Sequence, residues 1–419
     1  MKLKSTYLPA FAFAALASTL TPASADVVTD WNQITVAATK TGGLNSNLGT
    51  RIDAIASIAV YDAVNSILQF GTPYHYNVPP TGPADPAAAV AQAAHDVLTN
   101  YFPAQVTALD SNLNYTLSFI PNGPAKANGQ AVGSAAAADI IALRAGDGSS
   151  PNTTYPGPGV ITVGAYQLTP NIPTVTSPPF TFGPGINSQW ANVTPFVLTS
   201  PSQFRPVPPP AVGSAKYTKA LNEVKVLGNP ANPRHTTEQT SIAQFYKQDA
   251  EILVNEAGRL LSAAHGLSLK DNALLFLRLN LALADSRIAE WDAKYFYLYW
   301  RPITALNADP DGVVRNNYTA WRPTILTPNH PSYPSGHSGT VVGIEVLRAY
   351  FGDANTLTLH TTTAGEPPRT VTSLTQIEIE NGLSRVYGGI HFSFDNEAGQ
   401  ILGYNVAARV LTHGPQLLP

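Results

Sequence analysis

The alternation of apolar and polar residues along the chain predicts a mainly α-helical protein. Residues 52–64 show an apolar stripe with the period of a helix, and the composition of 125–144 is rich in alanine, the strongest helix former. We expect further helices at 87–100, 105–119, 214–227, 237–261, 267–300, 338–351 and 391–411. The last four of these are long enough to pack as a bundle.

A segment rich in proline and glycine interrupts this helical pattern. Residues 151–210 hold 14 of the chain's 36 prolines, together with Phe180, Phe182, Trp190 and Phe196. Proline and glycine disfavour helices, whereas large aromatic residues favour packing over a free linker. We therefore expect an N-terminal helical region at 26–150, an ordered but irregular covering segment at 151–212, and a C-terminal helical region at 213–419.

The first 25 residues have the pattern of an export signal. A basic start at Lys2 and Lys4 precedes an apolar run at 8–17, and the small residues at 23–25 fit a cleavage site before Asp26. We expect a periplasmic or extracellular protein. No later segment is apolar over a length that would span a membrane.

The net charge and the sulfur content of the chain exclude some classes of protein. The net charge of −3 and the lack of a basic tract argue against nucleic-acid binding. The chain contains no cysteine and a single methionine, Met1, so disulfides are excluded and the mature chain would contain no sulfur. A sulfur-free chain would resist strong oxidants, although compositional drift explains the same feature.

Three stretches in the second half of the chain carry groups suited to an oxyanion. The first contains Lys294 and Arg301, followed by Pro302. Seven residues at about 100° each return to nearly the same helix face, so we expect both cations to point the same way. The helix is expected to end near Pro302, because proline restricts the residue before it.

The second stretch is a turn at residues 334–337. Pro334 fixes its own backbone, and the predicted helix 338–351 follows directly. The turn would present the Ser335 hydroxyl, the Gly336 N–H and the His337 imidazole at a helix N-terminus, where anions bind well. Gly336 would also let the backbone approach a ligand closely.

The third stretch contains Arg385, a pair of glycines at 388 and 389, and then His391 and Asp395. The glycines break the backbone, and His391 and Asp395 are expected at positions i and i+4 of a new helix. Lys294, Arg301 and Arg385 would then neutralise an oxyanion, and His337 and His391 would be available for chemistry.

These three stretches resemble the signature shared by vanadium-dependent haloperoxidases and acid phosphatases related to type 2 phosphatidic acid phosphatase (PAP2). The pattern is Lys-x6-Arg-Pro, Pro-Ser-Gly-His and Ser-Arg-x5-His-x3-Asp. It is matched by Lys294, Arg301, Pro302, Pro334, Ser335, Gly336, His337, Ser384, Arg385, His391 and Asp395. The resemblance implies two four-helix-bundle units, with the active site at one end of the C-terminal bundle.

If the protein is a haloperoxidase, the resemblance implies a vanadate cofactor, with hydrogen peroxide, halide and an organic acceptor as substrates. His391 would ligate vanadium, and His337 would act as the acid–base group. The oxygens of vanadate would be held by Lys294, Arg301, Ser335, Gly336 and Arg385, and Lys294 would also polarise the peroxide. The algal bromoperoxidases of this resemblance carry a histidine at the position of His330, and the fungal chloroperoxidase carries a tryptophan at the position of Trp291. We favour bromide as the halide. Their alternative roles are a turn-capping histidine and core packing.

Two other functions fit the same residues. In an exported acid phosphatase without a cofactor, His391 would be the nucleophile, Asp395 would orient it and His337 would protonate the leaving alcohol. A non-catalytic oxyanion-binding helical protein is the third hypothesis. In each case a buried Arg385 would need a carboxylate partner, for which Asp285, Asp292 and Glu238 are the candidates.

Overall fold

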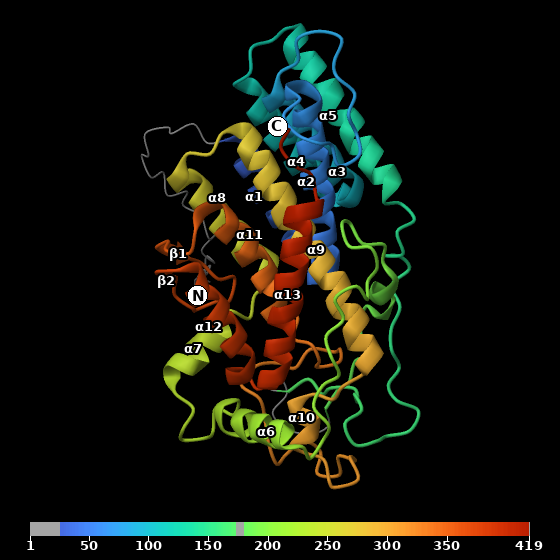
Figure 1. Ribbon diagram of the computed structural model, residues 1–419, viewed down its shortest axis with the longest axis vertical. Coiled ribbons are helices and arrows are strands. Elements are labelled where there is room, and N and C mark those ends of the chain that lie inside the picture. Colours follow the sequence, from blue (N-terminus) through green and yellow to red (C-terminus); the bar gives the residue numbers. More distant parts are fainter. Residues whose placement is uncertain (1–25, 173–179, 419) are drawn as a thin grey trace, which may run out of the picture.

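The structure, a computed structural model, describes residues 26–172 and 180–418 (Figure 1). The expected signal peptide at 1–25 lies outside the described residues. The prediction of a mainly α protein is confirmed. The helices are α1 (Val27–Thr41), α2 (Ser46–Leu68), α3 (Pro86–Tyr101), α4 (Val106–Ser118), α5 (Pro124–Leu143), α6 (Ala215–Leu227), α7 (Thr237–Phe245), α8 (Ala250–His265), α9 (Leu269–Tyr297), α10 (Pro302–Ala305), α11 (Val341–Phe351), α12 (Leu374–Tyr387) and α13 (Ser393–His413).

Helices α1 to α5 pack together in the upper half of Figure 1. Helix α2 is the centre of this group, since it contacts α1, α3 and α5 and is buried over most of its length. Small residues allow the close approach of α3 and α5. A Cβ added to Gly133 of α5 would lie only 2.4 Å from the Ala89 carbonyl oxygen of α3. The alanine-rich sequence thus serves both helix formation and tight helix packing.

Helices α9, α11, α12 and α13 form the C-terminal group. Glycines on α13 allow the chain around residues 335–342 to pack directly on this helix. A Cβ on Gly399 would lie 2.3 Å from the Ser335 carbonyl oxygen, and one on Gly403 would lie 2.3 Å from Val341 Cγ1. This contact joins the second and third sequence stretches in space.

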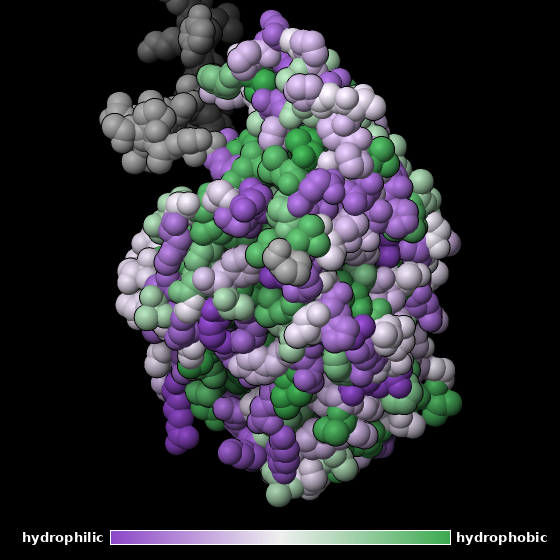
Figure 2. Space-filling view, turned by 45° about the horizontal axis from the view of Figure 1, so that its top comes forward, coloured by the Kyte–Doolittle hydropathy of each residue, from purple (hydrophilic) through white to green (hydrophobic). Residues whose placement is uncertain are grey.

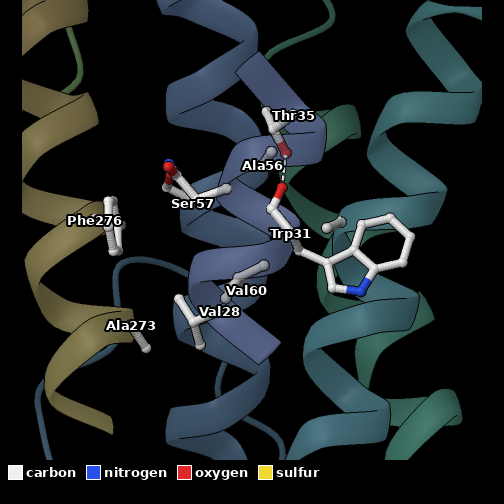
Figure 3. Close-up of a pocket in the computed structure, with 10 residues that line it drawn as sticks. Val28, Trp31, Thr35, Ala56, Ser57, Val60, Ala273 and Phe276 are labelled. Atoms are coloured by element: carbon white, nitrogen blue, oxygen red, sulfur yellow. Dashed lines mark hydrogen bonds between the residues drawn. The ribbon is translucent and has the colours of Figure 1, made fainter. Parts of the chain in front are cut away.

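The two groups meet along α9, which contacts α1 and α2 as well as α11 and α13. A chain of buried amides crosses the contact, with Asn32 Nδ2 donating to Asn255 Oδ1 (2.8 Å) and Asn255 Nδ2 donating to Asn280 Oδ1 (3.0 Å). A cavity of about 20 Å³ lies beside it, between α1, α2 and α9 (Figure 3). This space suits about one water molecule.

The segment between α5 and α6 is irregular but well packed where the structure describes it. Trp190 is 1% exposed, and the carboxylate of Asp285 on α9 accepts the backbone N–H groups of Phe196, Val197 and Leu198 at 2.6–2.9 Å. The Tyr295 hydroxyl donates to the Ile186 carbonyl oxygen. These bonds attach the segment to α9.

Several expectations on local structure are wrong. The expected helix 237–261 is two helices, α7 and α8, because residues 246–249 leave the helix and the carbonyls of Tyr246 and Gln248 accept from side chains elsewhere. Helix α12 and the antiparallel pair β1 (Leu357–Leu359) and β2 (Arg369–Val371) were not expected. The strands are three residues long, too short for a clear sequence pattern.

Over the described residues, none of the helices has the length and apolar character needed to cross a bilayer. Apolar and polar side chains are interspersed over much of the face shown in Figure 2.

Candidate active site

The end of α9 places Lys294 and Arg301 close together, although not on one helix. The helix stops at Tyr297, because Leu298 adopts a left-handed conformation (φ 45°), and Arg301 precedes the short helix α10, which begins at Pro302. The expectation that both cations lie on one helical face is therefore wrong, as is the expected helix end at Pro302. Both side chains are nevertheless fully buried, and each contacts the loop at residues 330–334.

Lys294 holds this loop by hydrogen bonds to its backbone. Its ammonium group donates to the carbonyl oxygens of Pro331 (3.2 Å) and Ser332 (3.1 Å) and also to that of Pro334. Three N–H groups thus meet three carbonyls. Burial and the nearby Arg301 lower the pKa of Lys294 well below its usual value.

The turn at 334–337 rests on a buried ion pair of α9. Arg287 Nη1 lies 2.7 Å from Glu290 Oε2 and donates to the Gly336 carbonyl oxygen at 2.8 Å. A Cβ on Gly336 would lie 2.9 Å from Arg287 Nη1, and one on Gly339 would lie 1.8 Å from Glu290 Oε1. The glycines are thus required by the ion pair beneath the turn.

Ser335 is fully buried in the same turn. Its Oγ accepts from the Ser338 hydroxyl at 2.9 Å, and its N–H donates to the Asp395 carbonyl oxygen at 3.0 Å. Ser335 therefore lies behind the turn, where it connects the second stretch to the third.

His391 and Asp395 form a buried pair at the start of α13. The expectation that they share a helix is wrong, because α13 begins at Ser393 and His391 precedes it. The pairing itself is present: His391 Nδ1 lies 3.0 Å from Asp395 Oδ2, which also accepts from the Ser332 hydroxyl (2.6 Å) and the Phe392 N–H (3.0 Å). The carboxylate therefore holds the proton of His391 on Nδ1 and leaves a lone pair on Nε2.

The lone pair of His391 faces a cation. Arg301 Nη1 lies 3.0 Å from His391 Nε2, and it also donates to the Ile390 carbonyl oxygen at 2.8 Å. Burial and then the charges of Arg301 and Lys294 lower the pKa of His391 well below its usual value. The imidazole is therefore neutral, the form that can ligate a metal or attack an electrophile.

Arg385 lies at the end of α12 without the carboxylate expected for it. Its Nε donates to Ser384 Oγ (2.8 Å) and its Nη2 to the Tyr246 carbonyl oxygen (2.7 Å). Burial, with Arg301 nearby, lowers the pKa of Arg385 to about 9.

All three candidate carboxylates have other partners. Asp285 caps the backbone of 196–198, Asp292 pairs with Arg205 at 2.7 Å, and Glu238 pairs with Arg369. The expectation of an ion pair with any of them is wrong. Among the described residues Arg385 forms no ion pair, so its charge is balanced only by backbone and hydroxyl oxygens.

His337 and His330 complete the set of imidazoles. His337 Nε2 lies 3.1 Å from the Gln248 carbonyl oxygen, and a carbonyl only accepts, so Nε2 carries the proton and Nδ1 is the basic nitrogen. Burial, followed by the charges of Arg385 and Arg287, lowers the pKa of His337. His330 Nδ1 lies 3.0 Å from Arg301 Nη2.

Trp291 lies beside this cationic group. Its ring centroid is 4.9 Å from that of His330 and 5.7 Å from the Lys294 ammonium nitrogen. Trp291 is 5% exposed, and its indole N–H has no hydrogen-bond partner among the described residues.

A cavity of about 240 Å³ joins these groups. Of the site residues predicted from the sequence, six line it: Trp291, His330, Gly336, His337, Arg385 and His391. The other four, Lys294, Arg301, Ser335 and Asp395, lie behind this wall and hold it in place. The three sequence stretches are thus brought together, in two layers.

Sequence reasoning missed the residues that support these groups. Gln248, Tyr246 and Ser332 act through carbonyl or hydroxyl oxygens, which leave little trace in a sequence. Arg287 and Glu290 offered a signal, since charged residues three apart in the apolar helix α9 indicate a buried pair.

Comparisons with known proteins bear on the fold that carries these residues. Residues 274–418, which contain all three stretches, match the family model described as the VCPO second helical-bundle domain. This match shows that the C-terminal helical part of the chain is similar to that domain. A search among curated protein sequences found no match.

Solved structures of bacterial vanadium-dependent haloperoxidases share the fold over most of the chain. A bacterial vanadium-dependent iodoperoxidase superposes with a TM-score of 0.79 at 23% identity, covering 94% of this chain and 97% of that one. A holo-type bacterial vanadium-dependent chloroperoxidase gives a TM-score of 0.70 at 18% identity, covering 88% and 93%. At these identities the likeness shows that this chain has the same fold as those proteins.

Proposed function

We propose that this protein is a vanadate-dependent haloperoxidase that oxidises halide with hydrogen peroxide. The reaction consumes hydrogen peroxide, a halide ion and a proton, and it yields hypohalous acid and water. The halide loses two electrons and the peroxide O–O bond breaks. Bromide is the halide we propose.

The observation that carries the proposal is the environment of His391. Its neutral imidazole has a lone pair on Nε2, a carboxylate fixing Nδ1, and the buried cations Arg301 and Arg385 close by. A neutral imidazole among buried cations can ligate a metal oxyanion, and the oxyanion would balance charges that the protein balances poorly.

The residues present fit vanadate. His391 Nε2 would hold the metal in place of its present 3.0 Å contact with Arg301 Nη1, and Arg385 and Arg301 would hold the oxygens. When bound, vanadate would supply a Lewis acid for peroxide activation. Gly336 lies at the same wall, and its N–H would add a hydrogen bond to an oxygen of the cofactor. Ser335 and Lys294 act on this wall from behind, by bonds to Ser338 and to the loop carbonyls.

His337 is proposed as the acid–base group. It lines the same cavity as His391, and the Gln248 carbonyl keeps the proton on Nε2, so Nδ1 can take a proton from a substrate. The lowered pKa of His337 favours the neutral, proton-accepting form at neutral pH.

An acid phosphatase is the second candidate, and the pair His391–Asp395 is compatible with it. The 3.0 Å contact between His391 Nδ1 and Asp395 Oδ2 orients Nε2 as a nucleophile equally well for a phosphoryl group.

We also propose that the protein is exported from the cell, on the pattern of residues 1–25.

The deciding experiment uses mature protein, residues 26–419, dialysed free of vanadate and phosphate. Bromide oxidation by peroxide is assayed while orthovanadate is titrated in, and a saturable rise from zero is expected. A flat response with hydrolysis of para-nitrophenyl phosphate that vanadate inhibits would replace the proposal by the phosphatase. A flat response with neither activity would favour the non-catalytic oxyanion binder.

A further inference from the structure

Three contacts from other parts of the chain hold His337 in the wall of the active-site cavity. The imidazole Nε2 lies 3.1 Å from the Gln248 carbonyl oxygen, and the backbone carbonyl oxygen of His337 accepts from Asn381 Nδ2 at 3.1 Å. The carbonyl oxygen of the preceding residue, Gly336, accepts from Arg287 Nη1 at 2.8 Å. The position of His337 therefore depends on how firmly each of these three partners is held.

Arg287 is held by two further residues in addition to its ion pair with Glu290. Its Nε donates to the hydroxyl oxygen of Ser46, the first residue of α2, at 3.1 Å. The same hydroxyl donates to Glu251 Oε2 on α8 at 2.7 Å, and Glu251 is 4% exposed. A chain of hydrogen bonds thus runs from α8 through α2 and α9 to the carbonyl of Gly336.

The Ser46 hydroxyl is the acceptor that Arg287 Nε has among the described residues. Arg287 is 4% exposed, so loss of this hydroxyl would leave a buried N–H without a partner, which is unfavourable. Nε and Nη1 belong to one rigid, planar guanidinium. A rotation that gave Nε a new acceptor would therefore move Nη1 and weaken its bond to the Gly336 carbonyl.

The start of α8 supports His337 by two routes. The carbonyl of Gln248, two residues before this helix, contacts the imidazole directly. Glu251, in the first turn of the helix, acts on the backbone before His337 through Ser46 and Arg287. The ring and the backbone of this histidine are thus held from one place in the fold, which none of the three sequence stretches contains.

We propose that Ser46 and Glu251 are positioning residues for His337, acting through Arg287 and the Gly336 carbonyl. The inference rests on the proposed acid–base role of His337, since the place of an imidazole affects turnover only if the imidazole exchanges a proton with a substrate. A misplacement of about 1 Å can lower turnover about 10²-fold, so a partial shift of the turn should be measurable.

The first test is crystallographic and needs no activity. Crystals of Ser46→Ala and Ser46→Thr are compared with those of the wild type. In Ser46→Ala we expect the distance from Arg287 Nη1 to the Gly336 carbonyl oxygen to rise from 2.8 Å to more than about 3.5 Å, with a shift of His337. Ser46→Thr keeps the hydroxyl and should keep the distance. An unchanged distance in Ser46→Ala would overturn the proposal, whether or not the protein is an enzyme.

The second test is kinetic and uses a matched control on the same helix. Ser46→Ala should lower kcat for bromide oxidation about tenfold at saturating vanadate, and Ser46→Thr should restore it. The affinity for orthovanadate in equilibrium dialysis should change less than about threefold, because His391 supplies the ligand. Ser57→Ala is the control, since Ser57 Oγ also accepts from α9, from Asn280 Nδ2 at 2.9 Å, but lies outside the active-site cavity. Its kcat should equal that of the wild type.

A double variant separates positioning from a general structural effect. When His337→Ala is already present, Ser46→Ala should change the residual kcat less than about twofold, because no imidazole is left to position. A tenfold loss in both backgrounds would show that Ser46 acts on the whole site, and the proposal would be overturned.

Glu251 supplies a second pair of variants. Glu251→Gln keeps an oxygen that accepts from Ser46 and should retain the wild-type kcat, whereas Glu251→Leu removes it and should lose about tenfold. Wild-type kcat in both Ser46→Ala and folded Glu251→Leu would overturn the proposal. If Ser46→Ala shows the crystallographic shift but the wild type has no vanadate-dependent bromide oxidation, the haloperoxidase function is refuted and the link from Ser46 to His337 stands.

Discussion

Loss of either partner of the buried pair Arg287–Glu290 should destabilise the protein strongly. Glu290 is fully buried, the Arg287 side chain is 5% exposed, and their 2.7 Å contact lies beneath Gly336 and Gly339. Removing one partner of such a pair leaves an uncompensated buried charge, at a cost of about 3–5 kcal/mol.

The substitution Glu290→Gln keeps the shape of the side chain and removes its charge. Arg287 also bonds Ser46 Oγ, which donates to the Glu251 carboxylate at 2.7 Å, so a second carboxylate offsets part of the loss. We therefore expect a destabilisation near the lower end of the range, about 3 kcal/mol, in urea unfolding of the vanadate-free protein.

A matched control is Glu397→Gln, at an ion pair with Lys216 whose side chains are 56% and 58% exposed. An exposed pair contributes at most about 1 kcal/mol, so this variant should resemble the wild type. The double variant Arg287→Gln/Glu290→Gln should lose less than the two single losses together. If Glu290→Gln costs less than about 1 kcal/mol, the reasoning on the buried pair is refuted.

Three further predictions concern the imidazoles and the buried carboxylates. His391→Ala should abolish vanadate retention in equilibrium dialysis, whereas His337→Ala should retain vanadate and lose about 10²–10⁴-fold in turnover; equal loss of binding in both would contradict these roles. Asp395→Asn should weaken vanadate affinity about 10–100-fold in the same dialysis, because Asp395 fixes the proton on His391 Nδ1. Burial raises the pKa of Glu251 from 4.5 to about 7, so the unfolded state releases its proton first and this group lowers stability as the pH rises from 4.5 to 7. Urea unfolding over that range should show a smaller fall for Glu251→Gln than for the wild type, and an unchanged fall would refute the assignment.

Much of the fold follows from local sequence patterns. The apolar period predicted most helices because a helical stripe of apolar residues must be buried whatever covers it. The prediction of one long helix at 237–261 is wrong because of contacts with distant parts of the chain. Residues 246–249 leave the helix, and the carbonyls of Tyr246 and Gln248 accept from Arg385 and His337 instead.

The candidate site divides in the same way. The three sequence stretches indicate which residues come together. Only the structure shows which of them line the cavity and which lie behind its wall. Lys294 and Arg301 were expected to point along one helix face into the site; the structure directs Lys294 to three loop carbonyls and places Arg301 beyond the end of α9.

The sequence by itself determined the helical class and the residue types available for an oxyanion, because both depend on neighbours within a few positions of the chain. Only the tertiary structure decided which partner each buried group meets. Arg385 bonds a carbonyl 139 residues away, and Arg287 bonds a hydroxyl 241 residues away. Such partners are chosen by the packing of whole helices, which brings distant segments together and leaves each buried charge to the nearest available oxygen.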